Sequence, residues 1–299
     1  MTTRTRVIAF SFLCAVSIMF WRNSLTNTLE LALSNDAYTH ILLILPLSAA
    51  LIYQDLKYGY SKALRVAPRV SPRIGVLLLA LALLIGCYAR WGMVAVPDDV
   101  RLSLGMISLV NWWIGSVLLC FGSDAFRSSL FPLCFLFWMV PVPAFVVKEL
   151  VQFLQYQSAF AARILFQVIG VPVSQDGIML AVPDANIEIA SECSSIRSSL
   201  MLVVTTMVLA HLFLRSWWRK GLLVTASIPL SVAKNGLRIV TIVELGTKID
   251  PGFLDGKLHH NGGIIFFGIS VLAIVTMLRI LRRTEFRMPL THVLESGQK

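Results

Sequence analysis

Three short stretches of this 299-residue chain carry chemically reactive side chains within largely apolar surroundings. "SECSSIRSS" places Cys193 and Arg197 where a polar stretch gives way to the apolar "LMLVVTTMVLAHLFL". "SVAKNGLRIVTIVEL" carries Lys234 and Arg238 within an apolar run, and "KLHHNGGIIFF" places two histidines just before another. A thiol, a guanidinium and an imidazole are the groups that acyl transfer by a cysteine nucleophile uses.

Cys193 lies at a position that favours a reactive thiolate. We expect a helix to begin at Ser194 or Ser195, so that its free N–H groups and dipole stabilise an anion at Cys193. Arg197 is one turn further on the same face and lowers the thiol pKa as well. The other interpretations of Cys193 are a chance residue and an intermolecular disulfide. The remaining cysteines lie in apolar runs, where a free thiol packs as a small hydrophobe: Cys14, Cys87, Cys120 and Cys134.

The second stretch places charges where a membrane helix is expected. Lys234 and Arg238 are four residues apart and share a helix face, with Asn235 beside them. Charges inside a membrane segment are costly, so they indicate a functional site. The alternative is that Arg238 extends to the outer lipid headgroups.

The adjacent histidines, His259 and His260, precede the last apolar run. A pair of this kind is usually part of a polar loop, and a metal site prefers other spacings. A site formed by both histidines and Cys193 lacks a fourth ligand. We therefore predict neither a metal nor another cofactor.

The composition is that of an integral membrane protein. The chain is 57% hydrophobic and 14% charged, with a mean hydropathy of +0.76, whereas soluble proteins are about 45–50% apolar and about 25% charged. The net charge of +10 fits basic loops on the cytoplasmic side, so nucleic acid is not needed to explain it.

The apolar runs predict an all-α membrane protein with about eight transmembrane helices in a single polytopic domain, residues 1–299. A span needs roughly 20 apolar residues. The expected spans are about 7–21, 38–53, 74–89, 102–121, 128–147, 197–214, 221–245 and 262–281. With both termini inside, the basic connections fall on the cytoplasmic side and "SECSSIRSS" on the outer face. No small-x-small cleavage site follows the first span, so we expect an uncleaved anchor.

Residues 148–196 form the one long external segment and lead into Cys193. Glutamines alternate with apolar residues over about 150–169, which predicts a helix lying in the membrane interface with its apolar side toward lipid. The next stretch predicts two short strands in a hairpin-like arrangement, with a turn at Gly177. Ile187 and Ile189 alternate there with the polar Asn186 and Glu188.

Taken in order, the three stretches resemble the exosortase/archaeosortase family of membrane cysteine transpeptidases. "ECSSIRSS" is similar to the family's cysteine motif, "NGLRI" to its arginine motif, and "HHNGGIIFF" to its His-x-x-x-Gly stretch, a spacing that selects His259 over His260. The resemblance is strongest over about 165–270. It implies that Cys193, Arg238 and His259 are catalytic. The site-lining residues would be Ser194, Ser195, Arg197, Asn235, His260 and Gly263. Ser195 stands where the family usually has glycine.

The resemblance also implies a function. Exosortases cleave exported proteins that end in a short signature such as Pro-Glu-Pro (PEP-CTERM), a membrane span and a basic tail. They transfer these substrates to an acceptor, unknown here, with a link to extracellular polysaccharide. We therefore expect a cytoplasmic-membrane protein with an outward-facing site, in contact with lipid and membrane-tethered substrates. The alternative is a transporter or polysaccharide-export component in which Lys234 and Arg238 line an anion path.

Overall fold

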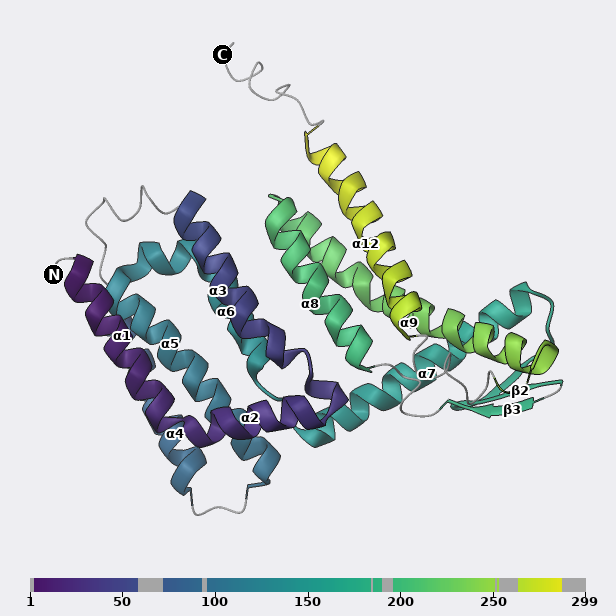
Figure 1. The fold of residues 1–299 in the computed structure, drawn as a ribbon, viewed down its shortest axis with the longest axis horizontal. Helices are drawn as coiled ribbons and strands as arrows, with labels where there is room; N and C mark the ends of the chain where they lie inside the picture. The colour runs from purple at the N-terminus through teal and green to yellow at the C-terminus, as the bar shows by residue number, and fades with distance from the viewer. Residues whose placement is uncertain are drawn as a thin grey trace, which may run out of the picture. The chain divides into compact units, whose positions relative to one another are not determined.

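The structure is a computed structural model that describes residues 3–58, 72–92, 96–183, 185–189, 196–250, 252 and 263–286. It is mostly helical with a small three-stranded sheet, which confirms the predicted class (Figure 1). The chain forms two compact units, residues 1–147 and 148–299, each described below by itself.

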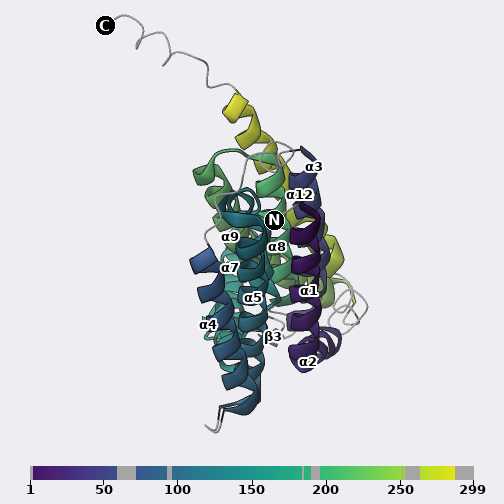
Figure 2. The ribbon, with the colours of Figure 1, turned by 90° about the vertical axis from the view of Figure 1, so that its left-hand side faces the viewer.

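The first unit is a set of helices that begins with α1 (Thr3–Phe20) and α2 (Arg22–Ser34). A short 3₁₀ turn, η1 (Asp36–Tyr38), precedes α3 (Ile41–Tyr58). The following helices are α4 (Pro72–Trp91) and α5 (Asp98–Ser128), which pack along each other (Figure 2). Two short helices follow in the region of the fifth expected span: α6 (Leu130–Phe135) and the 3₁₀ helix η3 (Leu136–Met139).

A sharp elbow joins α1 to α2, which are bent by 70° at Trp21. The Trp21 indole is buried, and its Nε1 donates a hydrogen bond to Ser108 Oγ on α5. Its ring lies 5.5 Å from that of Trp112, also on α5. The elbow is therefore fixed by aromatic packing, and the helix at 22–34 is not among the elements that the sequence predicts.

The expected span at 128–147 is wrong as a single helix. It is interrupted after Met139, and the next helix, α7, begins at Ala144. Pro141 and Pro143 lie in the break, and each lacks the N–H group that a continuous helix requires. The α6–η3 segment has ten residues, which span at most about 20 Å, whereas the hydrocarbon core is about 30 Å thick.

The second unit begins with α7 (Ala144–Val168), most of which belongs to it, and continues into an antiparallel meander of β1 (Ser174–Asp176), β2 (Met179–Val182) and β3 (Ala185–Glu188). Ser174 pairs with Ala181, and Leu180 with Ile187. The predicted turn at Gly177 is present, with φ +59°, a conformation that glycine adopts without strain. The meander adds a third strand to the two that were expected.

The helix predicted at about 150–169 is present as α7, although its position relative to the bilayer stays a prediction. Phe153, Phe160 and Ile164 are exposed, as a lipid-facing side requires. The opposite stripe is buried and includes Gln155, whose Nε2 donates to the carbonyl of Ile189 at 2.7 Å. That glutamine is therefore an internal anchor and not part of a solvated face.

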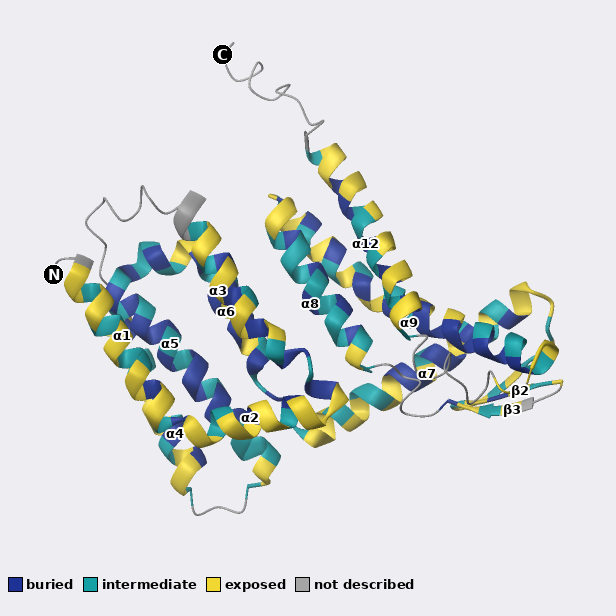
Figure 3. Ribbon diagram, viewed as in Figure 1, coloured by how far each residue is buried: buried dark blue, intermediate teal, exposed yellow. Residues whose placement is uncertain are grey.

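The second unit is completed by α8 (Ile196–Phe213), α9 (Trp217–Lys248) and α12 (Gly263–Phe286). The three helices pack around buried aliphatic side chains: Leu202, Ala210, Leu214, Leu223, Ile274, Leu278 and Leu281. Large apolar residues of α12 such as Ile264 and Leu272 are exposed, which is expected of a lipid-facing helix. Exposed residues recur along the length of this helix (Figure 3).

Among the residues that the structure describes, five helices are long and apolar enough to cross a membrane, and the number rises to seven if each of two bent pairs is one span. α9 is in neither group, because Lys234, Asn235 and Arg238 interrupt its apolar sequence. The chain is therefore a multi-span membrane protein, and the count of eight spans stays a prediction. The number of independently folding domains also stays a prediction.

Glu285 fastens one end of the three-helix group. Its carboxylate accepts backbone hydrogen bonds from Arg215 and Ser216, in the turn between α8 and α9. It also lies 3.8 Å from the buried guanidinium of Arg219. Hydrogen bonds to a charged acceptor are among the stronger ones in proteins.

We predict that Glu285→Ala lowers the melting temperature of the detergent-solubilised protein by roughly 2–4 °C or more. Glu244→Ala is the matched control, because Glu244 pairs with an exposed lysine one helical turn away, and such pairs stabilise little. Equal melting temperatures for the two variants would show that Glu285 does not fasten the turn.

Candidate functional site

The candidate site is built on a buried polar stripe along α9. Ser227, Ser231, Lys234 and Arg238 follow one another at spacings of three or four residues, so they share one face of this 32-residue helix. Lys234 is 6% exposed and Arg238 8% exposed, while Asn235 beside them is fully buried. Both cations are therefore covered by protein, contrary to the alternative in which Arg238 extends to lipid headgroups.

Two serines in the first turn of α8 hold this stripe. The ammonium group of Lys234 donates a hydrogen bond to Ser198 Oγ. One turn earlier on α9, Ser231 donates to Ser199 Oγ at 2.6 Å. Buried polar groups require partners of this kind. The start of α8 is thereby fixed against the charged turn of α9.

Close packing with α7 fixes the same part of α9. A Cβ atom built on Gly236 would lie 2.8 Å from Ala161 Cβ and 3.0 Å from the α7 backbone. Glycine therefore allows the two helices to approach closely. This contact gives Gly236, the glycine of the "NGLRI" stretch, a structural role. Gly236 lies between Asn235 and Arg238 in the sequence.

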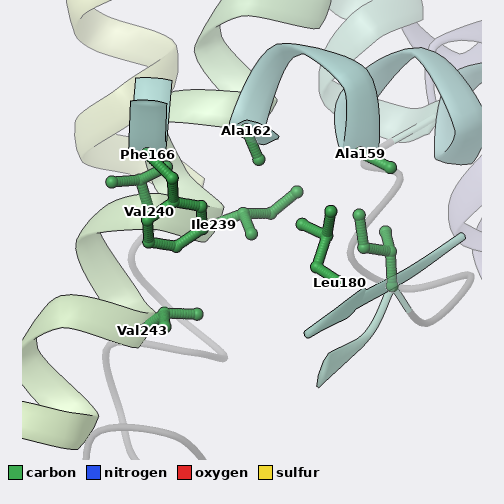
Figure 4. Close-up of a cluster of buried hydrophobic side chains, with 8 residues drawn as sticks. Ala159, Ala162, Phe166, Leu180, Ile239, Val240 and Val243 are labelled. Carbon is green, nitrogen blue, oxygen red and sulfur yellow. The ribbon is translucent and has the colours of Figure 1, made fainter. Parts of the chain in front are cut away.

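A hydrophobic cluster extends this contact to the sheet. Phe166 of α7 and Leu180 of β2 pack with Ile239, Val240 and Val243 of α9 (Figure 4). Ile189, just after β3, belongs to the same cluster and donates its N–H to Ile178 O. The chain that leads into Cys193 is therefore held at Ile189 by the sheet, by α7 and by α9.

An apolar groove of about 390 Å³ lies beside the stripe, between α7, α9 and α12. Ala161, Leu237, Phe266 and Ile269 contribute to its walls. Lys234 lines it as well and is its one charged residue among those described.

The structure describes four of the predicted site residues. Arg238 and Asn235 are buried on α9, whereas Arg197 is exposed in the first turn of α8. Gly263 is the first residue of α12, and no described atom lies within 4 Å of a Cβ built there. Five predicted site residues lie outside the described residues: Cys193, Ser194, Ser195, His259 and His260. Cys14, Cys87, Cys120 and Cys134 are free and lie in helices of the first unit.

Sequence reasoning missed the residues that position the charges. Ser198, Ser199 and Ser231 form the bonds to or beside Lys234, and Gln155 holds the chain before Cys193. The signal for Ser231 was present, because it lies three residues before Lys234 on the same helix face. No sequence signal pairs Gln155 with Ile189, 34 residues away.

A comparison with protein families matches residues 21–276 to the model of transmembrane exosortases. The chain belongs to the transmembrane exosortase family. The prediction of the family is thus confirmed. The match also covers residues well before 165–270, the range in which the motifs resemble the family most strongly. Comparison with curated proteins and with solved structures gives no significant match. The family region includes α9 and the start of α12, so the buried stripe lies within it.

We predict that Gly236→Ala destabilises this exosortase-family protein by about 1–3 kcal/mol, because a methyl group there meets α7 backbone that cannot move aside. Gly221→Ala, on the same helix, is the control. No atom of the described residues lies within 4 Å of a Cβ at Gly221, and alanine favours helix more than glycine. Thermal unfolding in detergent measures both variants, and similar curves would contradict the close α7–α9 contact.

Proposed function

We propose that this protein is a cysteine transpeptidase of the cytoplasmic membrane that cleaves a C-terminal sorting signal of exported proteins. Its site would face the outer side, and it would transfer the cleaved protein to an unknown acceptor. The observation that carries the proposal is the burial of Lys234 and Arg238, together with the hydrogen bond from Lys234 to Ser198 in the first turn of α8. The family match favours this activity over the transporter alternative.

Chain connectivity supports Cys193 as the nucleophile at this site. Ile196, the first residue of α8, is three residues after Cys193, and a chain of three residues reaches at most about 11 Å. Ile189 is four residues before Cys193, which limits the distance on that side to about 14 Å. Both residues belong to segments that are fastened to α7, the sheet and α9. Cys193 is thus tethered from both sides to the elements around Arg238.

In the proposed reaction Cys193 is the nucleophile, His259 transfers protons, and Arg238 stabilises negative charge. His259 takes the thiol proton of Cys193, and the thiolate attacks the carbonyl carbon of the scissile peptide bond. Arg238 stabilises the oxyanion. His259 then protonates the leaving amine as the C–N bond breaks, which leaves a thioester on Cys193. A nucleophile of the acceptor attacks the thioester while His259 takes its proton, and the thiolate is released.

The apolar groove beside Lys234 supports a lateral approach by the substrate. A substrate that carries its own membrane helix must reach the site from the lipid phase, and a groove between α7, α9 and α12 offers apolar walls for that approach. Ser194, Ser195, Arg197, Asn235, His260 and Gly263 are proposed to line the site around the reacting bond.

The deciding experiment is Cys193→Ser. We expect the variant to insert normally and to leave a cognate substrate at full length, because a hydroxyl has a far higher pKa than a thiol and is not activated by the same surroundings. Substrate size on a gel, beside the amount of enzyme in the membrane, is the measurement. Cys134→Ser is the control and should process normally. Full processing by a well-inserted Cys193→Ser protein would remove the nucleophile from the proposal.

The two adjacent histidines provide a second test. His259→Ala is expected to reduce processing by about 10²–10⁴-fold, as the loss of a general base typically does. His260→Ala should keep most of the activity. If His260→Ala is the inactive variant, the base is reassigned to His260, and the His-x-x-x-Gly spacing is not the guide to its identity.

A further inference from the structure

The first unit contains a polar groove where the ends of three membrane segments meet. Its volume is about 450 Å³, within the range of small-molecule sites. The groove lies at the α1–α2 elbow, at the last turn of α4 and at the first turn of α5. Two of these helices, α4 and α5, are candidate spans, and α1–α2 is one of the bent pairs. The groove therefore lies at a boundary between lipid and water.

The groove carries an excess of positive charge. Arg90 and Arg101 line it together with one carboxylate, Asp98, which leaves one net positive charge. Two asparagines and a serine from α2 add uncharged hydrogen-bonding groups: Asn23, Ser24 and Asn27. Guanidinium groups with nearby amides and hydroxyls are typical of phosphate binding.

The two arginines differ in what already holds them. Arg90 donates to the carbonyl of Phe20 at 2.8 Å, and its guanidinium lies 5.3 Å from the ring centroid of Trp91. The Arg101 side chain is half-buried and forms no hydrogen bond or ion pair with any residue that the structure describes. Its charge is thus available to a ligand, while Arg90 is already oriented by the elbow.

The surroundings indicate a lipid rather than a soluble anion. Trp91, next to Arg90, is exposed, as aromatic residues are at membrane interfaces. The turns before it, on α1 and α4, expose large apolar side chains such as Met19 and Leu84. A molecule with its phosphate in the groove can therefore place acyl chains along these helices.

We propose that this groove binds the headgroup of an anionic phospholipid, with Arg101 and Arg90 on the phosphate and the α2 side chains on the glycerol hydroxyls. The net charge of the groove matches the single negative charge of such a headgroup. This site lies in the first unit and does not depend on the transpeptidase activity proposed for residues of the second.

Titration calorimetry of the full chain in neutral detergent tests the site. Short-chain phosphatidylglycerol should bind more tightly than short-chain phosphatidylcholine, and Arg101→Gln should weaken its binding by about tenfold or more. Arg101→Lys keeps the charge and should lose less affinity. Arg127→Gln removes an exposed arginine at the other end of α5 and should leave binding unchanged.

Three results would overturn the proposal. Equal losses for Arg101→Gln and Arg127→Gln would mean that the protein attracts anionic lipid only by its overall charge. Equal binding of both lipids would remove the role of the net charge. Binding of inorganic phosphate as tight as that of phosphatidylglycerol would identify the ligand as a soluble anion. An unchanged melting curve for Arg101→Gln shows that a loss of binding does not reflect unfolding.

Discussion

The burial of two cations in one helix is the constraint on which the rest of the second unit depends. Lys234 and Arg238 are almost fully covered by protein, and a charge removed from water must find polar partners within the fold. Ser198 supplies one such partner, and the bond between Ser231 and Ser199 places the same turn of α8 against α9. The need to accommodate a charge therefore fixes the position at which α8 begins, directly after the cysteine stretch.

On its other side, the same turn of α9 is held by close packing against α7. Gly236 brings α7 into contact with the α9 backbone, and the aliphatic cluster around Phe166 and Leu180 joins both helices to the sheet. Gln155 of α7 then holds Ile189, at the end of the meander. A polar contact on one side and an apolar contact on the other thus position both ends of the chain around Cys193. The small sheet has a physical role in this arrangement, because it holds Ile189, the last residue that the structure describes before Cys193.

The sequence predicts the features that depend on residue type and short-range spacing. The apolar runs indicate most of the membrane helices, and the charges at Lys234 and Arg238 distinguish α9 from the other helices, because such residues are costly in lipid. The elbow at Trp21 is not predictable in this way, because it is fixed by contacts with Ser108 and Trp112 on a distant helix. Pro141 and Pro143 indicate the break after Met139. The prediction of one continuous span at 128–147 followed the apolar character of the stretch and gave these prolines too little weight.

Lys234 and Arg238 lie one helical turn apart with the same charge, which affects the chemistry that the site favours. Two like charges on one helix face repel each other, and in a covered site this repulsion is screened less than in water. Two neighbouring cations are most stable when a negatively charged group lies close by. A cysteine thiolate and a tetrahedral oxyanion are both negatively charged groups. In the proposed reaction, negative charge forms first on the thiolate and then on the oxyanion, and the two cations would stabilise both. The same charges that make α9 costly to place in lipid would then lower the free energy of the transition state in the proposed reaction.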